Sequence, residues 1–142
     1  MSDRSLADTN VLVYAHDVEA GERHEVAAGL VAAFWESGSD ATSTQVLQEF
    51  YVNATRKIPK PVPRAVARQI VRTYAVWQTE IVGPAEIERA SELEEQHQMS
   101  FWDALIVAAA VKAGATRVLS EDMSAGRSIA GVVIENPFSH VG

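Results

Sequence analysis

The sequence predicts an α/β fold with three layers, in which a short central parallel sheet is flanked by helices. Short apolar segments typical of buried strands alternate along the chain with longer segments whose apolar residues recur at helical spacing. Strands that are joined through helices pair in parallel, because the crossover returns the chain to the same end of the sheet. The chain has 142 residues and shows neither a repeat nor a linker, so we expect one domain over residues 1–142.

Five short segments rich in apolar and β-branched residues are the predicted strands. They are Ser5–Ala7, Ala41–Ser43, Glu80–Val82, Arg117–Ser120 and Val132–Ile134. Each is short enough to cross a small sheet once. In open parallel sheets, ligands bind beyond the carboxyl ends of the strands, so the residues that follow these strands are the first candidates for a site.

Three helices are predicted in the first half of the chain. The chain turns at Asp8 into a helix that starts near Val11, and Glu22–Ser37 forms a second helix that a glycine ends. Ser43 or Thr44 caps the third, because a serine or threonine side chain satisfies a free N–H at a helix start. The apolar faces of the second and third helices are Val26, Leu30, Ala33 and Phe34, and Val46, Leu47, Phe50 and Ala54.

Three more helices are predicted in the second half. Pro63 suits the first turn of a helix that ends at about Trp77, since proline needs no N–H partner there. Ser100 caps Phe101–Lys112, which is apolar nearly all round and should therefore be buried. Between them Ala85–Gln98 forms an acidic helix, with an inward face made of Ile87, Ala90 and Leu93.

The composition excludes several classes of protein. There are no cysteines, which excludes disulfides and thiolate metal sites, and the residues Met1–Ser5 do not resemble a signal peptide. The most apolar stretch, Ala104–Val111, is too short to span a bilayer. We therefore expect a cytoplasmic protein without a membrane segment. The three tryptophans, Trp35, Trp77 and Trp102, lie on apolar helix faces, and we expect them in the core. The four histidines do not have the spacing of metal ligands. They are His16, His24, His97 and His140.

Charge is distributed unevenly along the chain. The net charge is −7, yet residues 50–79 contain no acidic residue and hold 6 of the 12 basic ones. These six are Arg56, Lys57, Lys60, Arg64, Arg68 and Arg72. The three arginines from Arg64 onwards recur every fourth residue and so share one helix face. The sequence thus predicts a basic segment set against an acidic body.

Four acidic residues are placed where the predicted strands and helices would bring them together. Asp8 and Asp122 each follow a strand, Asp103 lies in the first turn of the buried helix, and Glu49 lies little more than one turn into its helix. The carboxyl ends of parallel strands and the starts of the helices that follow share one edge of the sheet. Taken singly, each acid has a structural explanation, as a helix cap or a solvated side chain.

Four carboxylates at one edge need a counter-ion or raised pKa values, because like charges at close range disfavour the ionised form. A site of oxygen donors without sulfur suits Mg²⁺ or Mn²⁺. Such an ion activates water and neutralises charge on a phosphate, and two ions about 4 Å apart would clamp both reacting oxygens.

Several segments resemble, in the same order, the motifs of PIN-domain nucleases, especially the VapC-type toxins of bacterial toxin–antitoxin pairs. The segments are LADTNVLVYA at residues 6–15, STQVLQEFY at 43–51, SFWDALIVAAA at 100–110, LSEDM at 119–123 and the closing NPF at 136–138. The ordered set covers essentially the whole chain. The resemblance implies a PIN fold and a Mg²⁺- or Mn²⁺-dependent endoribonuclease that hydrolyses RNA with metal-activated water. It also implies a homodimer and a cognate antitoxin that blocks the site.

The resemblance also assigns roles to residues. It carries over Asp8, Asp103 and Asp122 as direct metal ligands, and Glu49 as a ligand through water or as a base that orients it. At the fourth motif Glu121 adjoins Asp122, and the family's spacing of Ser or Thr, any residue and Asp favours Asp122. The residues expected to hold the carboxylates or a water in place are Thr9, Asn10 and Ser120.

Three alternatives stay open at this point. The basic segment is a candidate RNA-contact surface, or else a solvated face or a contact with the other subunit or the antitoxin. The chain could be a PIN-fold interaction module without catalysis, whose mark would be the loss of an acid, and all four are present. A haloacid-dehalogenase-type phosphohydrolase would use Asp8 as its nucleophile, but it needs a second Asp where this chain has Asn10.

Overall fold

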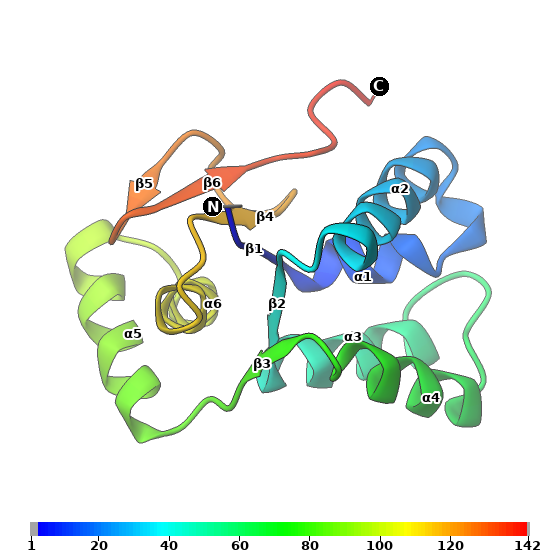
Figure 1. Ribbon diagram of the computed structural model, residues 1–142, viewed down its shortest axis with the longest axis horizontal. Coiled ribbons are helices and arrows are strands. Elements are labelled where there is room, and N and C mark those ends of the chain that lie inside the picture. The colour runs from blue at the N-terminus through cyan, green and yellow to red at the C-terminus, as the bar shows by residue number, and fades with distance from the viewer. Residues whose placement is uncertain (1–2, 142) are drawn as a thin grey trace.

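A six-stranded sheet crosses the middle of the computed structural model, which describes residues 3–141 (Figure 1). Met1 and Ser2, part of the segment compared above with a signal peptide, lie outside the described residues, as does Gly142. The strands are β1 (Ser5–Ala7), β2 (Asp40–Ser43), β3 (Gln78–Glu80), β4 (Arg117–Leu119), β5 (Ser128–Ile129) and β6 (Val132–Glu135). Their order across the sheet is β3-β2-β1-β4-β6-β5.

Six α-helices cover the two faces of the sheet, which confirms the three-layer α/β prediction. They are α1 (Thr9–Ala15), α2 (Glu22–Ser37), α3 (Thr44–Arg56), α4 (Arg64–Tyr74), α5 (Pro84–His97) and α6 (Phe101–Lys112), with a short 3₁₀ helix at Val18–Ala20. In Figure 1, α1 to α4 lie on one side of the strands, and α5 and α6 lie on the other. No helix among residues 3–141 is long and apolar enough to cross a membrane.

The pairing of strands follows from the helical crossovers. β1 pairs in parallel with β2 and β4, β2 with β3, and β4 with β6. The exception is β5, which is antiparallel to β6 and was not predicted. It is only two residues long, and Ala130 and Gly131 connect it to β6 with positive φ angles of 52° and 84°. A turn with two positive φ angles matches the twist of a tight hairpin.

Most predicted boundaries are confirmed, and the differences have local causes. The helices Glu22–Ser37 and Phe101–Lys112 have the predicted ends. α1 starts at Thr9 rather than near Val11, because the Asp8 side chain accepts a hydrogen bond from the Thr9 N–H at 2.7 Å and caps the helix. The strand predicted at Glu80–Val82 begins earlier, as β3 (Gln78–Glu80). Thr79 pairs with β2, whereas Ile81 is 71% exposed.

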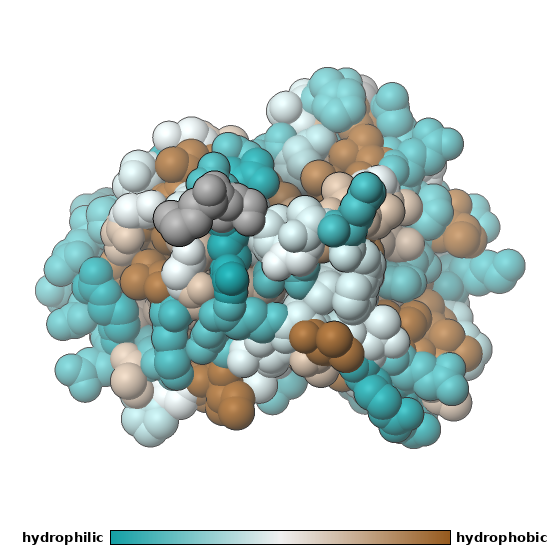
Figure 2. All heavy atoms as spheres, in the orientation of Figure 1, coloured by the Kyte–Doolittle hydropathy of each residue, from teal (hydrophilic) through white to brown (hydrophobic). Residues whose placement is uncertain are grey.

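The core surrounds α6, whose residues from Ala104 to Ala110 are all buried. Two of the three tryptophans contradict the prediction that all lie in the core. Trp77 is buried, whereas Trp102 in the first turn of α6 and Trp35 are largely exposed. Ile87 and Ala33, expected to face inward, are also exposed. Figure 2 shows hydrophobic side chains in small groups among hydrophilic ones, and such small groups are normal on a protein surface.

Candidate active site

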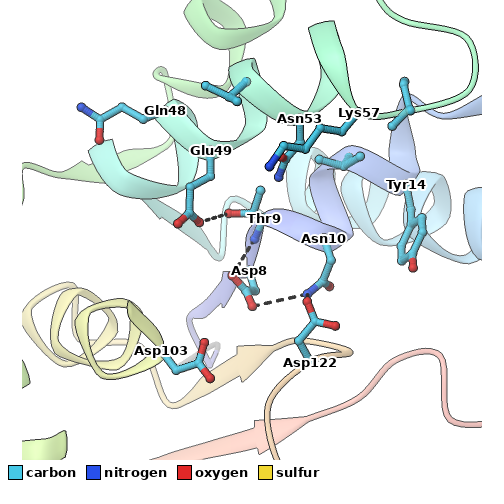
Figure 3. A pocket seen from close by; sticks show the side chains of 13 residues that line it. Asp8, Thr9, Asn10, Tyr14, Gln48, Glu49, Asn53, Lys57, Asp103 and Asp122 are labelled. Atoms are coloured by element: carbon cyan, nitrogen blue, oxygen red, sulfur yellow. Dashed lines mark hydrogen bonds between the residues drawn. The ribbon is translucent and has the colours of Figure 1, made fainter. Parts of the chain in front are cut away.

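The four predicted acids line one pocket of about 670 Å³ (Figure 3). Asp8 directly follows β1 and caps α1, and its N–H donates to the Leu119 carbonyl at the end of β4. Asp122 lies in the turn after β4 and Asp103 in the first turn of α6, while Glu49 projects from α3. The pocket therefore lies at the carboxyl ends of the strands, where parallel sheets bind their ligands.

The four acids line different sides of this pocket and do not converge on one point. Within residues 3–141, no three acidic or histidine side chains are close enough together to hold a metal ion as they stand. In Figure 3, Asp8 lies in the middle, Glu49 on one side, and Asp103 and Asp122 on the other. Carboxylates that share a pocket repel one another when ionised, and this repulsion favours a spread arrangement. The structure thus brings the four together as lining residues of one pocket, and not as a closed set of ligands.

Within residues 3–141, no lysine, arginine or histidine forms an ion pair with any of the four pocket acids. Burial raises the pKa of Asp8 to about 6; hydrogen bonds from Ser120 and Thr9 oppose the shift, and the charges of Glu49 and Asp103 add to it. Burial also raises the pKa of Asp103, with further contributions from Asp122 and Glu49. A divalent cation would relieve this repulsion, and the donors present are the oxygen ligands that Mg²⁺ and Mn²⁺ prefer.

Asn10 and Ser120 hold two of the acids by hydrogen bonds. The Ser120 hydroxyl donates to Oδ2 of Asp8 at 2.7 Å and accepts from the Asp122 N–H at 3.1 Å. The Asn10 amide donates to Oδ2 of Asp122 at 3.1 Å and to the Ser120 hydroxyl at 3.3 Å. Both residues therefore lie where the sequence places them, next to Asp8 and Asp122.

Glu49 is held by two side chains from different parts of the fold. The Thr9 hydroxyl donates to its Oε1 at 2.7 Å, and the Gln45 amide contacts its Oε2 at 3.4 Å. Gln45 is buried and also donates to the Trp102 carbonyl at 3.1 Å. Gln45 was not among the predicted site residues, although its position one helical turn before Glu49 in the sequence is a signal that indicates such a contact.

Glu121 belongs to a different set of contacts. Its carboxylate accepts a hydrogen bond from the Tyr14 hydroxyl at 2.6 Å and pairs with Nε of Arg23 at 2.7 Å. Burial raises its pKa, but the bonds to Tyr14 and Arg23 outweigh that effect, so the net shift is downward. Asp122 lines the pocket and Glu121 does not. The sequence analysis missed Tyr14 and Arg23, which are 107 and 98 residues away from Glu121 along the chain.

The basic segment is divided among different surfaces. Of its six basic residues, Lys57 lines the acidic pocket, and Arg68 lines an apolar groove of about 450 Å³ between α3 and α4. All six are exposed, and the other four line neither cavity. Among the histidines, Nε2 of His16 is hydrogen-bonded to the Tyr74 hydroxyl at 2.7 Å, and burial lowers the pKa of His16. This contact between α1 and α4 is a structural role.

Comparison with known proteins identifies the family. The PIN domain model matches residues 6–126. The crystal structure of Mycobacterium tuberculosis VapC20, a sarcin-ricin loop cleaving toxin, is similar with a TM-score of 0.66 and 25% identity, over 91% of this chain and 98% of that chain. A toxin–antitoxin complex from Klebsiella pneumoniae gives a TM-score of 0.67 at 20% identity, over 94% and 97%. VapBC2 from Rickettsia felis, bound to a DNA fragment from their promoter, gives 0.63 at 16%, over 93% and 97%.

A search of curated protein sequences finds no match. The family model covers far more than half of the chain, and the structural neighbours match almost its whole length. The chain therefore belongs to the PIN-domain family of nucleases, and it is of the VapC type found as the toxin of toxin–antitoxin pairs.

Proposed function

We propose that this chain is a Mg²⁺- or Mn²⁺-dependent endoribonuclease that acts as the toxin of a toxin–antitoxin pair. The observation that carries the proposal is the pocket at the carboxyl ends of the strands, with four acids from four elements around it. Its membership of a nuclease family supplies the reaction class. The likeness to VapC20, whose name describes cleavage of the sarcin-ricin loop, favours RNA as the substrate.

The donors in the pocket fit a hard divalent cation. Asp8, Asp103 and Asp122 are the carboxylates that we assign to hold it, and Glu49 is assigned a contact through water. When bound, the cation supplies positive charge to the phosphate and lowers the pKa of water. The raised pKa of Asp8 supports this assignment, because a carboxylate buried among other carboxylates is stabilised by an added cation.

The protein's own side chains then have three tasks in the hydrolysis. Asn10 and Ser120 fix the orientation of the carboxylates of Asp8 and Asp122 by the hydrogen bonds described above. Thr9 and Gln45 fix Glu49. We assign Glu49 as the base that accepts a proton from the attacking water, as the water oxygen bonds to phosphorus and the ester oxygen leaves. Positioning of this kind keeps the reacting groups aligned.

An antitoxin and a second copy of the chain are part of this proposal. The structural neighbours include toxin–antitoxin complexes, which supports an antitoxin partner.

Two observations favour a nuclease over the alternatives. All four acids are retained around the pocket, unlike in an interaction module that has lost catalysis. Asn10 donates its amide to Asp122 and has no acidic proton, unlike the acid that a dehalogenase-type phosphohydrolase needs.

The test is cleavage of a structured RNA by the purified chain with Mg²⁺, with Mn²⁺, or with EDTA. We expect cleavage that depends on the cation and is abolished by Asp8→Asn and by Asp103→Asn, since each removes a carboxylate from the pocket. The Asp17→Asn variant is the matched control, because Asp17 is also a buried helix cap but lies outside the pocket. Activity that survives both pocket substitutions, or EDTA, contradicts the proposed mechanism.

A further inference from the structure

One face of α3 carries polar side chains at four-residue intervals. Gln45, Glu49, Asn53 and Lys57 recur at this spacing, so they follow one side of the helix and its C-terminal cap. The last three line the acidic pocket. Gln45 and Glu49 already have roles in the proposed nuclease site, because the Gln45 amide donates a hydrogen bond to the Glu49 carboxylate. Asn53 and Lys57 have no place in the nuclease site described so far.

Neither of these two side chains has a partner in the part of the chain that the structure describes. Over residues 3–141, the Asn53 amide makes no hydrogen bond, and the Lys57 ammonium makes neither a hydrogen bond nor an ion pair. Figure 3 shows both side chains directed into the pocket, on the side of Thr9 away from Asp8. Lys57 is the single cationic residue among those described as lining the pocket. Polar groups left free in a cavity are available to a ligand.

The pocket changes in chemistry along α3. Its acidic part contains the four carboxylates, and the part near the end of α3 is lined by apolar side chains together with the amide and the ammonium. The apolar residues are Val13, Val52 and Ile58. Glu49 and Lys57 are separated by eight residues, or about 12 Å along the helix at 1.5 Å per residue. Because the pocket is lined along this length of α3, it has room for a group beside the four carboxylates.

A nucleotide matches this arrangement. A base that is not paired has apolar faces and an edge of hydrogen-bond donors and acceptors, and its neighbouring phosphate carries a negative charge. An asparagine amide offers both a donor and an acceptor, and a lysine binds a phosphate as a point charge. A cavity of about 670 Å³ is also within the range of sites for small ligands.

We propose that Asn53 and Lys57 form a nucleotide subsite next to the scissile phosphate. Lys57 binds the adjoining phosphate of the RNA, and the Asn53 amide recognises the edge of the base between the two phosphates. This proposal rests on the proposed function, because it requires an RNA strand in the acidic pocket. It assigns to Asn53 a part in selecting the cleavage sequence, and it selects Lys57 from the six basic residues of the segment.

The test of Asn53 uses a pool of RNAs with random bases around one cleavage site, with the cleaved ends sequenced. We expect Asn53→Ala to weaken the preference at one position beside the cut by about 3- to 10-fold, which corresponds to the loss of one hydrogen bond. Asn53→Asp should change which base is preferred there, since it replaces the amide donor with an acceptor. A cleavage profile identical to that of the wild type in both variants overturns the assignment.

The test of Lys57 measures KM at several salt concentrations. We expect Lys57→Ala to raise KM with little change in kcat, and to reduce the slope of log KM against log salt by about 0.7, the value for one phosphate contact on a single strand. Lys57→Arg should restore the slope. Lys112→Ala is the charge-matched control, because Lys112 lies at the end of α6 and contacts Glu86. An unchanged slope with tighter Mg²⁺ binding would show that Lys57 only balances the acidic charge, and would refute the subsite.

The outcomes separate this proposal from the proposed function. If the wild type cleaves no RNA, the nuclease assignment fails. If the wild type cleaves RNA and folded Asn53 and Lys57 variants keep its base preference and salt slope, the subsite alone fails. Melting curves establish that each variant is folded. Where a small antitoxin gene adjoins the gene for this chain, variants that lose binding to its product, with RNA cleavage unchanged, would assign the two side chains to a protein interface and also overturn the subsite.

Discussion

Glu121 and Asp122 are adjacent in the sequence but belong to two electrostatically different regions. Glu121 has a cation and a hydroxyl within 2.7 Å, from Arg23 and Tyr14, and its pKa is lowered. Asp122 faces the pocket, where burial and neighbouring carboxylates raise the pKa of Asp8 and Asp103. One region is an ion pair, and the other is an acidic pocket in which Lys57, the one basic residue among those described as lining it, forms no ion pair.

The difference separates acids that stabilise the fold from acids that cost it stability. A carboxylate with a partner contributes favourable energy, whereas a buried one among like charges is destabilising when ionised. Residues that destabilise a fold are retained where function needs them. The contrast therefore supports our proposal that Asp8 and Asp103 are functional, by a criterion that does not depend on family resemblance. It can be tested one residue at a time.

The largest expected effect is on catalysis. Asp122→Asn should reduce the rate of RNA cleavage at least about 100-fold, because loss of a residue that merely orients a metal ligand already costs about 10- to 100-fold. Glu121→Gln should cost less than about 10-fold, since Glu121 does not line the pocket. Single-turnover cleavage at saturating Mg²⁺ measures both. Equal losses in the two variants would show that the turn as a whole, and not the carboxylate of Asp122, supports the reaction.

The acidic pocket was predictable from sequence because of strand order. Asp8 and Asp122 each follow a strand, and β1 and β4 turn out to be neighbours in a parallel sheet. Parallel pairing places their carboxyl ends together, so position in the sequence determines position in space. The cap at Ser100 and the apolar run after it likewise placed Asp103 at the start of a buried helix.

The contacts around the acids were less predictable, because they depend on tertiary packing. Arg23 reaches Glu121 across 98 residues, and no local pattern marks the pair. The exposure of Trp102 likewise depends on what lies opposite the first turn of α6, which helical periodicity does not reveal. Strand β5 has only two residues, which is too short to produce a pattern of alternating apolar and polar residues. In each case the missing information is the identity of a distant neighbour.

A second expected effect is on stability at neutral pH. Burial raises the pKa of Asp8 from its ordinary value of 3.8 to about 6, so the folded state holds the Asp8 proton more tightly than the unfolded state does. The sign follows: the cost of ionising Asp8 is absent below about pH 3.8, grows as pH rises, and is complete above about pH 6. Asp8→Asn should therefore raise the free energy of unfolding by about 2–3 kcal/mol at pH 7.5.

Denaturant unfolding of wild type and Asp8→Asn between pH 3.5 and pH 7.5, without divalent cations, measures this effect. Asparagine is also a good helix cap, so the change removes the charge and keeps the cap. Asp17→Asn is the control, because it neutralises a buried cap of the 3₁₀ helix outside the pocket. If Asp8→Asn is more stable than wild type by the same amount at all pH values, then packing or capping, and not the ionisation of Asp8, causes the difference.

The smallest expected effect has the opposite sign. Despite the opposing effect of burial, the hydrogen bonds from Tyr14 and Arg23 hold the pKa of Glu121 below its ordinary value of 4.5. The ion pair therefore stabilises the fold above about pH 4.5, and the stabilisation is lost as the pH falls through the folded-state pKa. Glu121→Gln should lower the free energy of unfolding by about 1 kcal/mol at pH 7.5, because the pair is partly screened by solvent and a glutamine keeps one acceptor. The same pH series measures it, and the difference from wild type should shrink as the pH falls below about 4.5 and the Glu121 carboxylate of the folded state takes up its proton. Relative to wild type, the free energy of unfolding of Asp8→Asn increases as the pH rises, and that of Glu121→Gln decreases. If both variants shift stability in the same direction at pH 7.5, the distinction between a paired acid and a pocket acid fails.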